Sequence, residues 1–134
     1  MGYRSDVYLK TTKEGYKKIR QILNENDDGF ELFTCPDDMK LESTPNKEYF
    51  ITMKWEDRKW YDGYEDVDAL MDAIDKISDE EPIHFMRLGE SIEDVEERYQ
   101  EPNGYRGDFY GLEFIRTVQT YGKYITDDDI IDNE

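Results

Sequence analysis

The chain has 134 residues, of which 37% are hydrophobic and 14% aromatic, enough for one domain with a packed core. Its 34 Asp and Glu residues outnumber 17 Lys and Arg residues, and the net charge of −17 argues against direct binding to nucleic acid or to an anionic membrane. The single cysteine, Cys35, excludes an internal disulfide and a multi-cysteine metal site, and a free thiol suits the reducing cytoplasm.

Hydrophobic spacing predicts a strand and then a helix at the start of the chain. Residues 6–10 alternate apolar and polar side chains, as in a strand. Thr11 and Glu14 have the spacing of a capping box, and apolar residues then recur at helical intervals. Gly29 is a candidate left-handed cap at the end of this helix.

Three strands are expected next. Residues 30–35 predict a short strand, residues 39–42 a weak one, and residues 47–55 the best defined of the three.

The second half of the chain predicts helices and strands in alternation. An apolar stripe indicates a helix over residues 64–77, and a strand follows over 83–88. Ser91 is expected to cap a third helix over 92–99, and residues 109–120 to form a long final strand.

This order favours an α+β fold. We expect a largely antiparallel sheet of four to five strands, with two main helices on one face and a short third acidic helix. Residues 1–125 would form a single domain, and residues 126–134 an acidic, flexible tail.

The charge is concentrated in one stretch. Residues 62–102 carry fifteen carboxylates, opposed only by Lys76, Arg87 and Arg98, which gives this stretch a net charge of −12. Residues 1–61 have a net charge of −1, and residues 103–134 a net charge of −4. Because like charges on one compact surface repel, the acidic stretch indicates a positively charged partner.

The acidic residues form a row on the predicted helix 64–77. Successive residues turn by 100°, so four carboxylates fall within about 80° of arc on its exposed side: Glu65, Asp68, Asp72 and Asp75. The predicted third helix adds Glu93, Glu96 and Glu97. Such a row can imitate the phosphates of a nucleic-acid strand. The alternative is an ordinary solvated helix face, with acids favouring the first turn.

Aromatic residues precede the acidic helix. Trp60, Tyr61 and Tyr64 are candidate partner contacts, because Trp and Tyr are favoured at interface hot spots. The alternative is that Trp55 belongs to the core and the others pack at the helix start.

Other chemistry finds little support in the sequence. Asn24, Asn26 and Asp28 match an EF-hand loop loosely, but its twelfth position is Cys35 rather than glutamate, so we reject a calcium site. There is no glycine-rich phosphate loop, and His84 has no local nucleophile partner. We predict no catalytic residue, no metal and no cofactor, and we expect that the protein is not an enzyme.

Several segments carry a resemblance to known proteins. The opening MGYRSDV (residues 1–7), YFITMKW (49–55), KWY (59–61) and FMRLGE (85–90) resemble small phage and prophage proteins of unassigned function. The resemblance covers about two-thirds of the chain and supplies no catalytic residues. It implies a cytoplasmic protein of an infected bacterial cell that binds and blocks a host protein, such as a nuclease of host defence or a CRISPR system.

Together these features predict an acidic, phage-type protein that blocks a basic nucleic-acid-binding host protein by imitating nucleic-acid charge. One alternative is a binder of a small anionic ligand such as a nucleotide signal. Its site would use basic residues: Lys13, Lys17, Arg20, Arg87, Arg106 and Arg116. A phage assembly accessory is a further alternative. The sequence leaves the partner's identity and the oligomeric state open.

Overall fold

The computed structural model describes residues 4–23, 28–91, 93–105, 107, 109, 113–115 and 117–132. Its elements, in chain order, are β1 (Ser5–Thr12), α1 (Lys13–Ile22), α2 (Asp28–Thr34), β2 (Asp38–Ser43), β3 (Tyr49–Arg58), α3 (Glu65–Ile77), β4 (Ile83–Leu88), β5 (Val95–Gln100), β6 (Glu113–Ile115), β7 (Thr117–Gln119), β8 (Lys123–Tyr124) and α4 (Asp127–Asp132). None of the helices within these residues has the length and apolarity to span a lipid bilayer.

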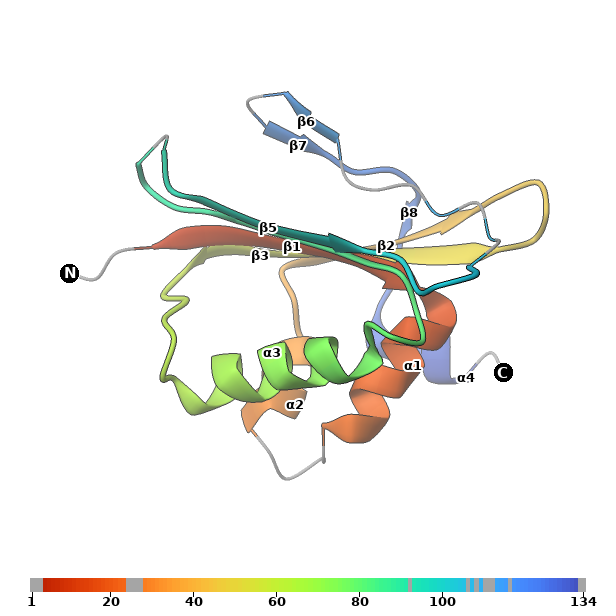
Figure 1. Ribbon diagram of the computed structural model, residues 1–134, viewed down its shortest axis with the longest axis horizontal. Helices are drawn as coiled ribbons and strands as arrows, with labels where there is room; N and C mark the ends of the chain where they lie inside the picture. The colour runs from red at the N-terminus through yellow and green to blue at the C-terminus, as the bar shows by residue number, and fades with distance from the viewer. Residues whose placement is uncertain are drawn as a thin grey trace.

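Six strands form one antiparallel sheet in the order β5-β4-β1-β3-β2-β8. The helices lie on one face of this sheet, and the hairpin β6–β7 lies on the other side (Figure 1). The expected α+β class and antiparallel sheet are therefore confirmed. The sheet is larger than the four to five strands predicted, and two short helices, α2 and α4, accompany the main helices α1 and α3.

The core lies between the sheet and its helices. Every second residue of β1 and β3 points to this side, as the pleat of a strand requires. Helix residues at spacings of three and four complete the core. Its central side chains are each at most 1% exposed: Val7, Leu9, Tyr16, Ile19, Ile51, Met53, Trp55, Leu70, Ile74 and Ile77.

The first helix differs in detail from the prediction. Its N-cap is Thr12 rather than Thr11, and Thr12 Oγ1 accepts a hydrogen bond from Gly15 N at 2.9 Å. The helix ends at Ile22. Gly29 is not its left-handed cap, because Gly29 lies inside α2 and is not among the residues with positive φ.

The strand predicted over residues 30–35 is wrong, because most of this segment belongs to the helix α2. Its alternating apolar residues suit either structure. Tertiary packing decides in favour of the helix: Phe33 is fully buried, and its ring centroid lies 4.6 Å from that of Tyr16 in α1. Gly29 packs so closely against α3 that a Cβ added there would lie 2.9 Å from the Cβ of Ala69.

The third acidic helix is also wrong, because Val95–Gln100 form the strand β5 and pair with β4. Ser91 starts a turn instead of a helix, since its carbonyl accepts a hydrogen bond from Asp94 N. Contacts across the hairpin outweigh the helical preference of the glutamates. Arg87 of β4, for example, binds both Asp94 and Glu96.

The C-terminal region also differs from the prediction. Its described residues form the short strands β6 and β7 of a hairpin, in place of one long strand over 109–120. Residues 127–132, expected in a flexible tail, form α4, and Ile130 is only 3% exposed.

The sheet face opposite the helices is buried as well. Lys10 is only 2% exposed, and its Nζ lies 3.2 Å from Glu42 Oε1 and 5.5 Å from the ring centroid of Phe50. The chain returns over this face after β5, where the Phe109 ring packs on the rings of Phe50 and Tyr99. This face is therefore not a broad solvated surface.

A candidate acidic docking groove

The predicted acidic row forms on the exposed side of α3. The apolar stripe of this helix is buried, while its four carboxylates are exposed: Glu65, Asp68, Asp72 and Asp75. Asp68 also supports the helix start, because its Oδ1 accepts a hydrogen bond from Gly63 N at 3.0 Å. The row is thus a fixed feature of a packed helix.

The strand β5 runs beside this row. Glu96 and Arg98 lie opposite Arg87 and Phe85 of β4, so both project to the helix-covered face of the sheet. The Arg98 guanidinium binds the Asp75 carboxylate and so joins β5 to α3. Two segments that are separate in the sequence therefore contribute to one surface.

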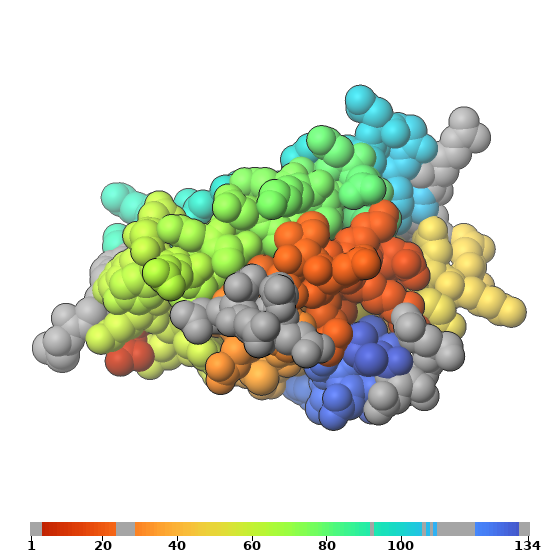
Figure 2. Space-filling model, turned by 90° about the horizontal axis from the view of Figure 1, so that it is seen from below, coloured from red at the N-terminus to blue at the C-terminus, as the bar shows by residue number. Residues whose placement is uncertain are grey.

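A groove of about 300 Å³ lies between α3 and β5. Its lining consists of Trp60, Asp62, Asp68, Met71, Asp72, Asp75, Glu96 and Arg98. Five of these residues are acids, and Arg98 is the one cation. We call this surface the acidic groove. It lies on the helix side of the molecule, along which α3 (green) runs beside α1 (orange) in Figure 2.

Part of the acidic charge is neutralised within the fold. Arg87 binds Asp94 and Glu96, and these two carboxylates, Asp94 foremost, raise the pKa of Arg87 above its ordinary value. Asp75 is paired with Arg98. Within the described part of the chain, no ion pair is found for three carboxylates of the groove, namely Asp62, Asp68 and Asp72. These three concentrate the negative field.

The structure separates the glutamates that were predicted to share a helix. Glu96 lines the groove, whereas Glu97 projects to the opposite face, where its Oε2 lies 2.7 Å from His84 Nε2. Glu93 is exposed in the turn between β4 and β5. Glu65 borders a different cavity. Of the predicted carboxylates, the groove therefore unites those at 68, 72, 75 and 96.

Three groove residues were not predicted as site residues: Asp62, Met71 and Arg98. Met71 belongs to the apolar stripe of the predicted helix. Asp62 lies within the acidic stretch and could have been found from its position before the helix. Arg98 gave no such signal, because its place depends on the register of β5 against β4.

The aromatic residues divide between core and surface. Trp55 is fully buried and its indole N–H donates to the Leu32 carbonyl at 2.8 Å, so it is a core residue, as the alternative reading held. Trp60 is 7% exposed and packs on Trp55 while lining the groove. Tyr61 and Tyr64 pack edge to face, with ring centroids 5.2 Å apart, and Tyr64 is 43% exposed.

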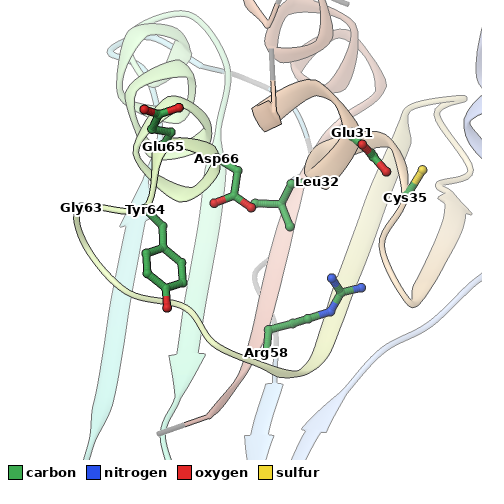
Figure 3. A pocket seen from close by; sticks show the side chains of 8 residues that line it. All are labelled: Glu31, Leu32, Cys35, Arg58, Gly63, Tyr64, Glu65 and Asp66. Atoms are coloured by element: carbon green, nitrogen blue, oxygen red, sulfur yellow. The ribbon is translucent and has the colours of Figure 1, made fainter. Parts of the chain in front are cut away.

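A larger cavity of about 730 Å³ lies at the N-terminal end of α3. Figure 3 shows Arg58 reaching from the end of β3 into the space between the start of α3 and the segment that carries Glu31 and Cys35. Its charges are mixed, because Glu65 and Asp66 line the same cavity as Arg58. With Glu31 the cavity holds three acids against one cation, whereas the acidic groove holds five acids against one, so the cavity is the less acidic of the two.

The basic residues named for an anionic ligand do not converge. Lys17 lies 3.8 Å from Glu14, and Arg20 lies 3.1 Å from Asp127. Arg87 is engaged by Asp94 and Glu96. Lys13 packs over the Tyr49 ring. Arg106 and Arg116 lie outside the described residues. This arrangement favours the acidic groove over an anion site.

Comparison with protein-family models, with curated proteins and with solved structures finds no match. Within the described residues, no group of three or more His, Cys, Asp and Glu side chains is arranged to hold a metal ion. Asn24 and Asn26 of the rejected calcium loop lie outside those residues.

Proposed function

We propose that this protein is an acidic, phage-type binding protein that blocks a basic nucleic-acid-binding protein of a bacterial host, such as a defence nuclease. The observation that carries the proposal is the convergence of carboxylates from α3 and β5 on one groove. A partner's Lys and Arg side chains, which normally hold phosphates, would bind there instead.

The groove has the chemistry that such side chains need. Carboxylates accept charge-assisted hydrogen bonds from ammonium and guanidinium groups. The apolar parts of Trp60 and Met71 offer a surface for the hydrocarbon stems of Lys and Arg. Asp62, Asp68 and Asp72 supply charge for which the described part of the chain shows no ion pair.

The net charge predicts how binding depends on salt. A chain of net charge −17 attracts a basic partner over a long range and speeds encounter. Salt screens this attraction, with a Debye length of about 10 Å at 0.1 M. Binding should therefore weaken as salt rises, and nucleic acid should compete with this protein for the partner.

The first experiment isolates a partner and then tests the groove. The immobilised protein is incubated with nuclease-treated bacterial lysate at low salt, and bound proteins are eluted with a salt gradient or with DNA and RNA. A captured nucleic-acid-binding protein is purified, and its affinity is measured against the triple variant Asp68→Asn, Asp72→Asn, Asp75→Asn. The matched control, Glu14→Gln, Glu31→Gln, Glu56→Gln, removes the same charge from exposed acids outside the groove.

We expect the groove variant to bind the partner roughly 10- to 100-fold more weakly. The estimate follows from the loss of three charge pairs, each contributing about 0.5–1 kcal/mol to binding. Its affinity should also depend less steeply on salt, and the control should change little. Equal affinity and equal salt dependence for the two triple variants would contradict the proposal, as would a partner that nucleic acid does not displace.

A further inference from the structure

Among the described residues, β5 is paired on one side only, which leaves one edge of the six-stranded sheet open. Val95–Gln100 pair with β4 on one side, and no described strand pairs with the other side. The opposite end of the sheet is only the short strand β8, which pairs with β2 at two positions. An open strand presents main-chain donors and acceptors to a further strand.

The direction of these main-chain groups follows from the β4–β5 hairpin. Gly89 N donates a hydrogen bond to the Asp94 carbonyl at 2.8 Å. From Asp94 onward, every second residue of this strand therefore directs its main-chain N–H and C=O groups toward β4. The residues between them turn their N–H and C=O groups to the open side: Val95, Glu97 and Tyr99. Val95 N also donates locally to the Glu93 carbonyl, at 3.1 Å.

The side chains of β5 are complementary to a second copy of the same strand. In an antiparallel pair centred on Glu97, Val95 lies opposite Tyr99 of the second copy, and Glu96 lies opposite Arg98 of the second copy. The Val95 and Tyr99 side chains are 45% and 47% exposed, an unusual exposure for apolar groups on one strand. This register also places the outward-facing residues opposite one another, as hydrogen bonding requires.

Neighbouring registers lose the apolar contact. Moving the centre of the pair to Glu96 or to Arg98 places Val95 or Tyr99 opposite Glu97 of the second copy, and sets Glu96 opposite Glu96 or Arg98 opposite Arg98. A shift by one residue would place residues that direct their N–H and C=O groups outward opposite residues that direct theirs toward β4, so the hydrogen bonds between the two copies could not form. One register is therefore favoured, because it alone pairs Val95 with Tyr99 and Glu96 with Arg98 while the outward main-chain groups face one another.

We infer that the open edge of β5 pairs with the same edge of a second copy of this chain, about a two-fold axis at Glu97. The inference does not rest on the proposed function. The open edge and the pairing pattern carry it, with Glu96 and Arg98 on the helix side and Val95 and Tyr99 on the other.

Two opposing features make this association weak. Glu97 meets Glu97 of the second copy at the axis, although each lies beside its own His84. The two copies also repel, because each has a net charge of −17. Added salt should therefore strengthen this pairing, whereas salt weakens binding to a basic partner, so the two ideas fail in distinguishable ways.

Sedimentation velocity over a concentration series up to about 1 mM chain, at low and high salt, tests the pairing. We expect a monomer–dimer equilibrium that shifts to dimer with concentration and with salt. Glu97→Gln should strengthen the dimer about two- to fivefold by removing the like-charged pair, and Glu97→Pro should abolish it. The proline spares the ladder to β4, because the Glu97 N–H faces outward.

Charge exchange identifies the register. Arg98→Glu and Glu96→Arg should each weaken self-association at least about tenfold, because each variant pairs like charges. A one-to-one mixture of the two should restore dimers, since positions 96 and 98 are then both acidic in one copy and both basic in the other. Asp75→Asn loses the same contact to Arg98 without altering β5, and should dimerise like the parent. Circular dichroism checks that each variant is folded.

Three results would overturn the inference: a monomer at every concentration, a dimer that Arg98→Glu leaves unchanged, or a mixture that forms no heterodimer. A parent chain that stays monomeric while another protein's strand occupies β5 would likewise overturn it.

Discussion

The buried hydroxyl of Tyr16 links α1 to α4. Its side chain is fully buried, and its hydroxyl donates to Asp127 Oδ1 at 2.5 Å. The same carboxylate accepts hydrogen bonds from Arg20. Burial, together with the hydrogen bond and the charge of Asp127, raises the pKa of Tyr16 far above its ordinary value near 10. A single carboxylate of α4 therefore fixes two residues of α1.

This raised pKa predicts a loss of stability in alkali. Above about pH 10 the unfolded chain releases the Tyr16 proton while the folded chain keeps it, so the free energy of unfolding falls as pH rises. The contribution of Tyr16 to this slope is about 1.4 kcal/mol per pH unit. Urea unfolding at about pH 9, 10 and 11 measures it.

Raised pKa values of Tyr8 and Tyr99 steepen the same slope, so the variant Tyr16→Phe isolates one residue. We expect Tyr16→Phe to reduce the pH dependence of the free energy of unfolding by the contribution of one proton, about 1.4 kcal/mol per pH unit. Tyr124→Phe, at a position 68% exposed, is the control and should leave the slope unchanged. An equal slope in parent and Tyr16→Phe would show that the hydroxyl does not carry this effect.

The groove residues show which positions can be predicted from spacing in the sequence and which cannot. The acids at 68, 72 and 75 were predictable, because helical periodicity alone sets their side. Glu96 and Glu97 were predicted on one helix, but the pleat of β5 sends them to opposite faces. The position of Arg98 in the groove depended on the same pleat. Two of the eight residues that line the groove, Glu96 and Arg98, could therefore not be placed from local periodicity.

At the scale of elements, α2 packs closely on α3 through a glycine. A Cβ at Gly29 would lie 2.9 Å from Ala69 Cβ, 3.2 Å from Leu23 Cδ2 and 3.3 Å from the Asp66 carbonyl oxygen. The two helices can approach this closely only because residue 29 has no side chain. The contact helps to explain why this segment is helical despite its strand-like sequence.

This contact predicts an unusual sign for a substitution in a helix. Gly29→Ala would favour an isolated helix by about 1 kcal/mol, but here it should destabilise the protein by about 1–3 kcal/mol through overpacking. Urea unfolding gives the difference. Adding Ala69→Gly should recover part of the loss, whereas Ala69→Gly alone should cost about 1 kcal/mol. A Gly29→Ala variant more stable than its parent would show that α2 moves freely on α3.

Elements with strong local periodicity were predicted well. The strand β4 matches its predicted range, and β1 and α3 differ from theirs only at the ends. The segments at 30–35 and 92–99 failed because their local preferences were ambiguous. Their structures depend on distant partners, namely Tyr16 and Ala69 for α2 and the Arg87 side chain for β5.

At the scale of the whole molecule, unbalanced charge opposes folding. The chain carries a net charge of −17, and Asp72 in the acidic groove has like-charged neighbours at Asp68 and Asp75 on the same helix. Repulsion of this kind destabilises a compact state and is relieved by screening. We therefore expect the melting temperature, measured at low protein concentration, to rise as NaCl is added.

Neutralising Asp72 tests how much of this repulsion arises on α3. Asp72→Asn removes two like-charged helical contacts, each costing about 0.2–0.5 kcal/mol, and should raise the free energy of unfolding at low salt by about 0.4–1 kcal/mol. The gain should shrink at high salt. Glu14→Gln, which removes an acid near Lys17, should not stabilise. A melting temperature that is independent of salt would mean that ion pairs within the fold already balance the charge.

The place of β1 at the centre of the sheet has a consequence for synthesis. β1 pairs with two strands that come later in the sequence, β3 and β4, and these end at Arg58 and Leu88. The hydrogen bond from the Tyr16 hydroxyl can form only after Asp127 has been synthesised. Contacts this distant in sequence slow folding, and the exposed intermediates are prone to aggregate. The native sheet therefore forms only after Leu88 has been synthesised, and the hydrogen bond between Tyr16 and Asp127 forms later still.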